Sequence, residues 1–384
     1  MDSNKKKICI FTAQFLPNVG GVENYCYNLA KTLSKSGNRC IIVTCNTHGL
    51  PPREDTEYAT IFRLKSLNFL NGRYPITLTT KENKSIWLQL LKSAPDFVVI
   101  NTRFYPLSLQ ALSFSKRLNI RPIVIEHGSA HLTSGSIIAD NVIQLVEHSI
   151  TSLDKLFPAD YYAVSNESSK WLSHFRIKCK GTLFNSIHPK EFRDSASNRA
   201  FRSELGLPSD TFLVASVGRL VKEKGIIELA KSSTSLKNNI SVLVAGDGPL
   251  KQYLKPYESE KFHLLGPLSK DDIAALLLQA DVLMLPSRSE GFATVLLESA
   301  ACYTPPITTD VGGAKEITCN GKYGMIIPCA DPNTLESAIN EAYNSRARIT
   351  ELGNKIENYV AENFSWNKTS AALLEACQIA QERL

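Results

Sequence analysis

The sequence lacks any long hydrophobic run. No stretch of about 18 consecutive apolar residues occurs among its 384 residues, so a membrane-spanning helix is not expected. The N-terminal stretch MDSNKKKICIFTAQF is charged and then apolar for only about six residues, which is too short for a secretory signal. We therefore expect a cytoplasmic protein.

Closely paired cysteines are also missing. The nine cysteines are scattered, and no two have the C-x-x-C spacing that zinc sites and redox pairs use. An odd, scattered set fits a reducing compartment better than a disulfide framework. Cys9, Cys40 and Cys45 lie in apolar runs, where a thiol behaves as a small hydrophobic group.

Strong charge of one sign is absent as well. The formal net charge is +6, which does not reach the basicity of a dedicated nucleic-acid binder. This modest excess suits a phosphorylated ligand or an anionic membrane surface. Apolar residues make up 43% and charged residues 21%, as is ordinary for a globular protein.

Short apolar runs alternate with helical patterns along most of the chain. Near-continuous apolar strands indicate parallel sheets covered by helices on both faces. The expected strands are 7–13, 39–45, 96–101, 121–127, 161–165, 212–218, 240–248, 262–266, 281–287 and 324–328. We predict an α/β fold of two Rossmann-like, doubly wound domains.

The length favours two domains, at about 150 residues each. A polar break at 186–198 separates two series of strands and helices. We therefore expect an N-terminal domain at 1–187 and a C-terminal domain at 188–365. The last segment, 366–384, is expected to form a helix that can cross back to the first domain.

Two motifs follow expected strands of the first half, where ligands of such sheets bind. Gly20 and Gly21 precede a helix, so backbone amides there can approach an anion. His127 ends a strand and precedes a glycine, which places it to donate a hydrogen bond to a ligand. A tight turn and a structural histidine are the alternatives for these two motifs.

The first strand of the second half leads into a cationic loop. Gly218, Arg219 and Lys224 lie in the segment VGRLVKEKG, which opens a helix. Arginine presents a planar fork to phosphate oxygens and lysine a point charge, so the pair can neutralise a diphosphate. Solvated surface charges are the alternative. The next turn, GDGPLK, has Lys251 where a dinucleotide fingerprint needs glycine, which disfavours an NAD oxidoreductase.

The most specific motif is SRSEGFATVLLE at 287–298. Glu290 lies in a loop after a strand, and Glu298 follows eight residues later on the next helix. The residues between them, Phe292, Ala293 and Thr294, turn into that helix, whose first amides can hold a phosphate. The two carboxylates are suited to bind sugar hydroxyls on either side of it.

In this order and spacing, the motifs resemble the family 4 retaining glycosyltransferases, glycosyl transferases group 1, which have the GT-B fold. The likeness runs through both halves and implies two domains facing a central cleft. It assigns the diphosphate to Arg219 and Lys224, the donor sugar to Glu290 and the ribose to Glu298. The glycine loop at Gly20 would close over the donor, and His127 would lie near the sugar and acceptor. Ser186-Ile187-His188 departs from the family pattern, so no donor contact is assigned there.

The resemblance implies a retaining transferase, with hexosyl transfer expected. The leading donor is a UDP-sugar and the second a GDP-sugar, and the N-terminal domain would bind a saccharide or lipid-linked acceptor. By analogy the product would be a cell-surface polysaccharide such as lipopolysaccharide, made at the inner membrane face. No D-x-D pair occurs, so we expect no metal cofactor. No nucleic-acid partner is expected.

Two other functions remain open at this point. A nucleotide-sugar 2-epimerase shares the architecture and needs no acceptor. A non-catalytic sugar-nucleotide sensor would bind the same donor without turnover. The glycine loop and the Glu290–Glu298 spacing favour transfer over epimerisation. The joint presence of Arg219, Lys224, Glu290 and Glu298 argues against a non-catalytic sensor.

Overall fold

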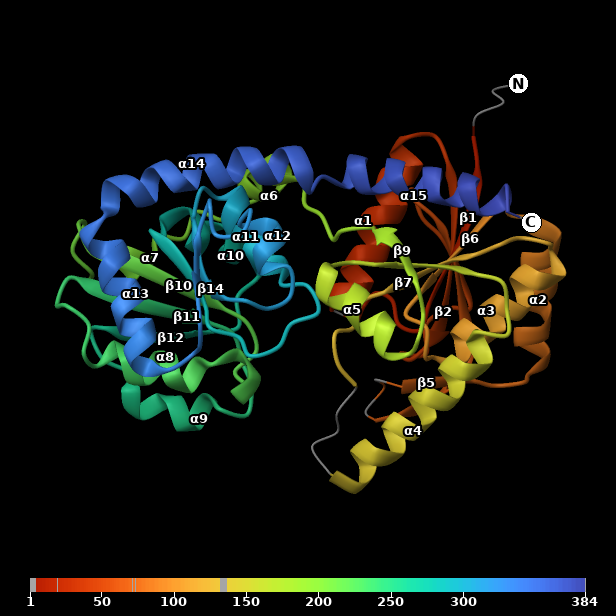
Figure 1. Ribbon diagram of the computed structural model, residues 1–384, viewed down its shortest axis with the longest axis horizontal. Helices are drawn as coiled ribbons and strands as arrows, with labels where there is room; N and C mark the ends of the chain where they lie inside the picture. Colours follow the sequence, from red (N-terminus) through yellow and green to blue (C-terminus); the bar gives the residue numbers. More distant parts are fainter. Residues whose placement is uncertain (1–4, 19, 71, 73, 132–136, 384) are drawn as a thin grey trace. The chain divides into compact units, whose positions relative to one another are not determined.

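The computed structural model describes residues 5–18, 20–70, 72, 74–131 and 137–383, with the side chains of 137–139 left out. The chain forms two compact units (Figure 1). Unit 1 comprises Met1–Asn185 and Trp366–Leu384, and unit 2 comprises Ser186–Ser365. In the described part of the chain, no helix combines the length and apolarity needed to cross a bilayer.

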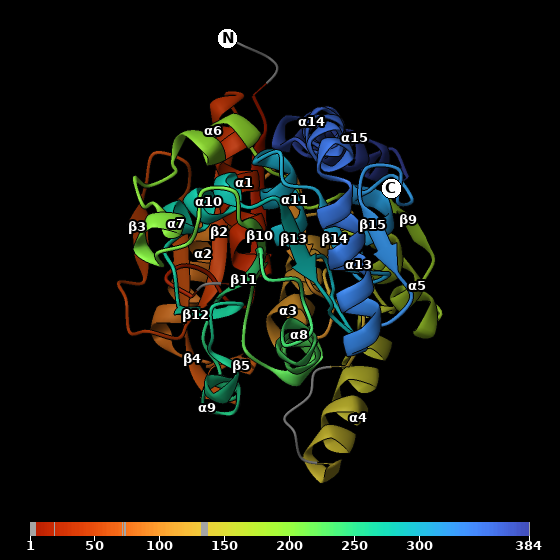
Figure 2. The same cartoon turned by 90° about the vertical axis from the view of Figure 1, so that its left-hand side faces the viewer.

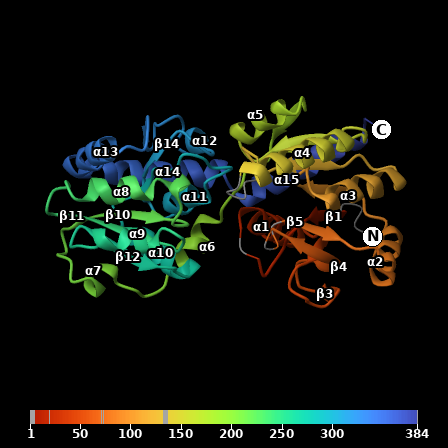
Figure 3. The ribbon, with the colours of Figure 1, turned by 90° about the horizontal axis from the view of Figure 1, so that it is seen from below.

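Unit 1 is built on one twisted sheet with the strand order β3-β4-β2-β1-β6-β7-β8-β9, and β5 pairs with β4. Figure 3 shows β3 and β4 at one edge and α5, which packs on β8 and β9, at the other. The strands are β1 (Lys7–Thr12), β2 (Arg39–Asn46), β3 (Arg53–Asp55), β4 (Thr60–Phe69), β5 (Tyr74–Thr77), β6 (Phe97–Asn101), β7 (Ile123–Glu126), β8 (Asp160–Ala163) and β9 (Cys179–Thr182). Among the strands that the structure describes, only β3 and β5 run antiparallel to their partner.

The described residues of unit 1 form six helices around this sheet. They are α1 (Gly21–Lys35), α2 (Lys81–Ser93), α3 (Pro106–Arg117), α4 (Ile137–Asp154), α5 (Asn166–His174) and α15 (Trp366–Gln381). Of these, α4 packs on α3. Apolar residues of β1 point alternately to both faces, and both sets are buried. Cys9, Cys40 and Cys45 are all buried, which confirms their role as small core groups.

Helix α15 returns the end of the chain to unit 1 and packs on α1. Trp366, at its start, is almost fully buried and meets the Tyr25 ring edge-on at 5.2 Å. Gln381, at its end, donates a hydrogen bond to the Arg121 carbonyl at 3.0 Å. Both ends of α15 are therefore anchored in unit 1.

Unit 2 contains a six-stranded parallel sheet with the order β12-β11-β10-β13-β14-β15. Figure 2 looks onto this unit, and its strands follow in that order from left to right. The strands are β10 (Phe212–Val217), β11 (Ile240–Ala245), β12 (Phe262–Gly266), β13 (Val282–Leu285), β14 (Pro306–Thr309) and β15 (Met325–Ile327). Successive strands are added on one side of β10 up to β12 and on its other side from β13 onward. The gap between β10 and β13 is therefore the topological switch point, where ligands of such sheets bind.

Helices cover both faces of the second sheet. Figure 1 shows α6 and α14 above the strands and α8 and α9 below them. The helices are α6 (Pro189–Asp194), α7 (Phe201–Glu204), α8 (Ile226–Ser233), α9 (Lys251–Leu254), α10 (Lys270–Gln279), α11 (Thr294–Ala301), α12 (Ala314–Ile317), α13 (Pro332–Asn344) and α14 (Arg346–Asn363), with 3₁₀ turns η1 (Lys222–Lys224) and η2 (Lys255–Tyr257). The predicted α/β class with two Rossmann-like, parallel-sheet domains is thus confirmed.

All ten expected strands are present, but five further strands were not predicted, namely β3, β4, β5, β9 and β14. The antiparallel β3 and β5 also depart from the expectation of purely parallel sheets. The sequence does not predict strand β4, because charged residues interrupt its apolar pattern. One of them, Arg63, is nevertheless buried and reaches Glu54 on β3 at 2.6 Å.

Candidate functional site

The switch point of unit 2 brings two loops into close contact. The loop after β10 turns at Gly225, which has the positive φ of 65° that glycine tolerates. A Cβ atom there would lie 2.1 Å from the Pro286 carbonyl oxygen, in the loop after β13. Glycine therefore allows the segment carrying Lys224 to lie directly against the segment carrying Glu290.

Lys224 and Glu290 form an ion pair across this contact, between Nζ and Oε1. The Ser287 hydroxyl donates a second hydrogen bond to the same carboxylate oxygen at 2.7 Å. The Glu290 side chain is 12% exposed and that of Lys224 is 27% exposed. The structure thus pairs Lys224, predicted to bind phosphate, with Glu290, predicted to bind the sugar. Both side chains remain partly exposed.

Arg219 follows Gly218 at the carboxyl end of β10, the edge of the sheet at which Lys224 and Glu290 also lie. It lines a small pocket with Gly218 and Lys224, and its side chain is exposed. Within the described residues, no carboxylate forms an ion pair with its guanidinium. A guanidinium of this kind is open to bind an anionic ligand with its planar fork.

Helix α11 begins beside Glu290. Ala293 is its N-cap residue, and no side chain caps the helix. The amides of Thr294 and Val295 belong to the first turn and have no acceptor within the helix. The N-terminus of α11 therefore presents N–H groups and a positive partial charge, which favour a phosphate.

Two glycines after β14 hold this loop in place. A Cβ atom on Gly312 would lie 2.1 Å from Cβ of Glu290, and one on Gly313 would lie 2.8 Å from the Phe292 ring. Both glycines have positive φ, and the Ala293 amide donates to the Gly312 carbonyl at 2.9 Å. The paired glycines are a sequence signal for this support, although strand β14 before them was not predicted.

Glu298 lies one turn into α11 and is partly buried. Burial raises its pKa to about 6, and Lys270 at the start of α10 opposes that shift. No described contact joins Glu298 to Lys224 or Glu290. The second glutamate of the motif therefore forms a separate part of the site, near α10.

The GDG turn after β11 has a packing role. A Cβ atom on Gly246 would lie 1.9 Å from the Gly218 carbonyl oxygen, and one on Gly248 would lie 2.6 Å from that of Leu220. The backbones of the two neighbouring loops therefore approach closely, and the turn supports the Gly218–Leu220 segment.

In unit 1, Gly20 is the N-cap residue of α1 and Gly21 is the first helical residue. A Cβ atom on Gly20 would lie 2.4 Å from the carboxylate of Glu23, which is buried. Burial raises the pKa of Glu23. Val19, in the middle of the predicted loop, lies outside the described residues.

His127 follows β7 in unit 1. Burial lowers its pKa to about 3, so the ring is neutral at physiological pH. Its Nε2 lies 2.9 Å from the Asn101 Oδ1, while the Asn101 amide nitrogen donates to the Phe11 carbonyl at 3.4 Å. Nε2 thus carries the proton and donates to Asn101, and Nδ1 can only accept. Contact of His127 with a ligand stays a prediction, and in this arrangement Nδ1 is the nitrogen left for it.

A buried charge network near His127 was not predicted from the sequence. Arg103 is 1% exposed and pairs with Glu126, which precedes His127, and with Glu147 on α4 at 2.6 Å. The second Glu126 oxygen accepts from the Gly128 amide at 2.7 Å. The network holds the chain on both sides of His127, and no local pattern pointed to it because its members are up to 44 residues apart.

Two family descriptions match the chain, one in each unit. Residues 19–180 match "Glycosyltransferase Family 4" and residues 197–362 match "Glycosyl transferases group 1". Together they take in the glycine loop, His127, the cationic loop and the Glu290–Glu298 motif.

Named relatives agree with these matches. The putative teichuronic acid biosynthesis glycosyltransferase TuaC of Bacillus subtilis is 35% identical over 173 residues, which are 45% of this chain and 43% of that protein. The uncharacterized glycosyltransferase MJ1607 of Methanocaldococcus jannaschii is 23% identical over 98% of this chain and 99% of its own. The Anabaena protein Alr3699/HepE, solved with UDP and glucose, has a TM-score of 0.69 at 15% identity, covering 97% of this chain and 99% of its own.

Proposed function

The chain belongs to the family 4, group 1 glycosyltransferases of GT-B fold, and from this premise we propose which transfer it performs. It moves a hexose from a nucleoside diphosphate sugar to a saccharide or lipid-linked saccharide, with retention at the anomeric carbon. A UDP-sugar is the first choice of donor and a GDP-sugar the second.

The observation that carries this proposal is the pairing of Lys224 with Glu290 beside Arg219 and the N-terminus of α11. A sugar diphosphate has two anionic phosphates next to a neutral, hydroxyl-rich ring. The site offers cations and helix amides for the first part and a carboxylate for the second. Since the ion pair holds the carboxylate next to the cation, sugar and phosphate can be bound side by side.

Glu298 is proposed to accept hydrogen bonds from the ribose hydroxyls. It lies one turn beyond the amides assigned to the phosphate, on the same helix. Burial raises its pKa only to about 6, so Glu298 is still mostly ionised at neutral pH. A partly buried carboxylate is incompletely hydrated, so hydroxyl groups of a nucleoside are favourable hydrogen-bond partners.

In unit 1, His127 is proposed to accept a hydrogen bond through Nδ1 from a hydroxyl of the donor sugar or the acceptor. Its neutral ring and the bond from Nε2 to Asn101 leave that nitrogen unprotonated. The neighbouring Arg103 network keeps the ring in one orientation. The N-terminal unit thereby contributes to substrate orientation and holds the acceptor.

Transfer with retention needs charge stabilisation more than a dedicated base. As the bond from the anomeric carbon to the diphosphate oxygen breaks, negative charge grows on the phosphate, where Arg219 and Lys224 can neutralise it. The acceptor hydroxyl attacks from the same face, and its proton passes to a leaving phosphate oxygen. No carboxylate is needed as a nucleophile in this route.

A solved Anabaena protein of the same fold that holds UDP supports the choice of UDP. The teichuronic acid relative supports a saccharide acceptor and a role in polysaccharide synthesis. Such an acceptor on a lipid carrier would place the reaction in the cytoplasm at the inner face of the membrane. The absence of D-x-D supports catalysis without a metal cofactor.

The test begins with a thermal-shift screen of UDP- and GDP-sugars, since a bound donor raises the Tm by mass action. The selected donor is then incubated with saccharide acceptors, and NMR determines the anomeric configuration of the product. We expect a glycoside with the donor's configuration. An inverted product, or a 2-epimer formed from donor alone, would refute the proposal.

A further inference from the structure

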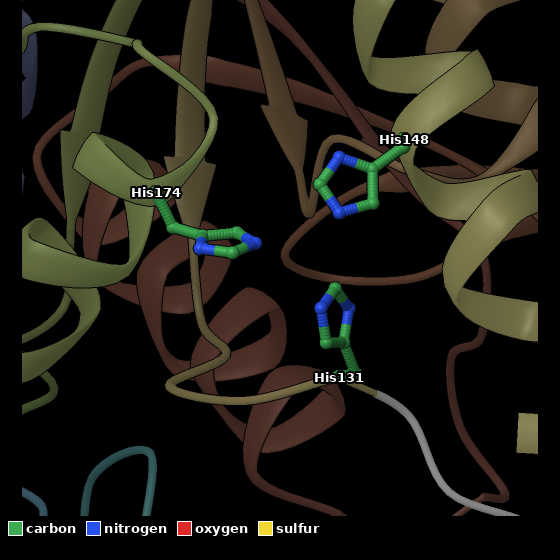
Figure 4. A group of neighbouring side chains, drawn as sticks. All are labelled: His131, His148 and His174. Carbon is green, nitrogen blue, oxygen red and sulfur yellow. The ribbon is translucent and has the colours of Figure 1, made fainter. Parts of the chain in front are cut away.

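Three histidines of unit 1 lie close together in the fold. His131 lies in the segment after β7, His148 is on α4 and His174 ends α5, and their rings face a common space (Figure 4). The ring centroids are 5.5, 5.5 and 5.3 Å apart, a nearly equilateral triangle. One nitrogen of each ring lies within 4.8 Å of those of the other two.

A buried carboxylate orients one of these rings. Nδ1 of His131 lies 2.7 Å from Oε2 of Glu147, whose other oxygen pairs with Arg103 at 2.6 Å. Metal-binding histidines typically donate their second ring N–H to a carboxylate in this way, which leaves Nε2 unprotonated for the metal. Glu147 is 1% exposed, so this supporting group is already positioned.

Aromatic side chains pack against the other two histidines, His148 and His174. The Trp171 indole stacks on the His174 ring at 4.9 Å with an interplanar angle of 5° and meets His131 edge-on at 4.7 Å. Phe175 packs against His148 at 4.8 Å. His148 and His174 are exposed, so an ion can enter from solvent and both rings can adjust to it.

We propose that His131, His148 and His174 form a binding site for a borderline divalent metal, with Zn²⁺ as the favoured ion. Imidazole nitrogen suits Zn²⁺, Ni²⁺ and Cu²⁺, whereas Mg²⁺ and Ca²⁺ prefer oxygen ligands. Three histidines leave the fourth tetrahedral position of Zn²⁺ to water. For Zn–N bonds of about 2.0 Å the three nitrogens must approach to roughly 3.3 Å, a small adjustment of the exposed rings.

The proposed ion would tie together three segments of unit 1. One is the chain that follows His127, and the others are helices α4 and α5. Because the metal binds the folded arrangement and the ligands are far apart in the sequence, it would stabilise this unit. Its role is structural, and it does not depend on the transferase reaction proposed above.

Untagged, full-length protein is stripped with EDTA, desalted and titrated with Zn²⁺ by calorimetry. We expect one ion per chain and a higher Tm with Zn²⁺ but not with Mg²⁺. His148→Gln and His174→Gln should each weaken binding at least about tenfold. His263→Gln, in unit 2, is the matched control and should bind as the parent does.

Co²⁺ gives an independent reading on the unmodified protein. Bound by three imidazoles, it should show the intense visible absorption of a four- or five-coordinate ion. Zn²⁺ binding that persists unchanged in His148→Gln and His174→Gln would overturn the proposal, as would a Co²⁺ spectrum of the six-coordinate aqueous ion. Circular dichroism of the metal-free variants checks that both exposed substitutions leave the fold intact.

Discussion

Lys224 and Glu290 are ion-paired although 66 residues separate them, and the Ser287 hydroxyl binds the same glutamate oxygen. Each charge lies at the carboxyl end of a different strand of the second sheet, β10 and β13. The pair keeps a cation and a carboxylate adjacent before any ligand binds. A site of this kind is preorganised, so little free energy is spent on ordering the groups when a ligand binds.

Replacing Lys224 with alanine should lower kcat by about 10²- to 10³-fold, because a cation that stabilises developing phosphate charge supplies several kcal/mol. Steady-state kinetics with the selected donor measures this. Lys222→Ala is the matched control, since Lys222 is an exposed lysine of the same 3₁₀ turn. Normal turnover in Lys224→Ala, or equal losses in both variants, would argue against the assignment.

Glu298→Gln should raise the stability of the protein at neutral pH while it weakens donor binding. Burial raises the folded-state pKa of Glu298 to about 6, so the native state loses stability as the pH rises from the unfolded value of 4.5 through 6. At pH 7.5 the neutral variant should be more stable by about 1 kcal/mol, a value reduced for partial exposure. Urea unfolding at pH 5 and 7.5 checks this difference.

The same substitution should raise the donor KM about 10- to 100-fold, as expected for loss of hydrogen bonds to a charged group. In the parent, donor affinity should decrease as the pH falls through 6, because Glu298 becomes protonated. Calorimetric titration with the nucleoside diphosphate from pH 5 to 8 measures it. A donor affinity independent of both pH and the substitution would remove Glu298 from the site.

Catalysis should survive excess EDTA. The sequence has no D-x-D pair to hold a metal on the diphosphate, and the loops offer Arg219 and Lys224 instead. Initial rates with and without EDTA at 25 °C should agree within error, even if the Tm falls through loss of an ion from the three-histidine site. Loss of activity that added Mg²⁺ or Mn²⁺ restores would contradict this expectation.

Asp154→Asn should stabilise the protein at neutral and higher pH. Both carboxylate oxygens of Asp154 are buried without a hydrogen-bond partner among the described residues. Burial raises its pKa from 3.8 to about 8, while Arg103 opposes that shift. Stability of the parent should therefore decrease by roughly 1 kcal/mol per pH unit as the pH rises from 4 to 8.

The Asp154→Asn variant should lack that dependence, and its advantage at pH 8 should amount to a few kcal/mol. Chemical unfolding of both proteins across this range provides the measurement. Parallel pH profiles would show that Asp154 has a partner or solvent access in solution.

Gly312→Ala should destabilise unit 2 by about 1–3 kcal/mol and reduce activity, because the added methyl meets Glu290 at a positive φ. Gly206→Ala is the control, since Gly206 also has positive φ but has open space around it. The control therefore reports backbone strain alone. Thermal unfolding and kcat of the two variants should differ, and equal effects would exclude the contact with Glu290.

Local patterns predicted much of this protein. Apolar runs bounded by turns identified ten strands, since an uninterrupted apolar strand is buried on both faces. Strand β4 was not predicted, because Arg63 interrupts its apolar pattern. Arg63 is buried through its ion pair with Glu54 of the neighbouring strand β3. The proton position on His127 was likewise out of reach, because Asn101, its partner, is 26 residues away.

By itself the sequence determined the α/β class, the family and the loops that carry the candidate groups, since strands, turns and motifs are set by neighbours along the chain. Only the tertiary structure decided that Lys224 meets Glu290, that Arg103 joins Glu126 to Glu147, and that three histidines converge. Such contacts depend on strand order and on how helices pack against the sheet. Those relations arise from burial of the whole core, which no short stretch of sequence contains.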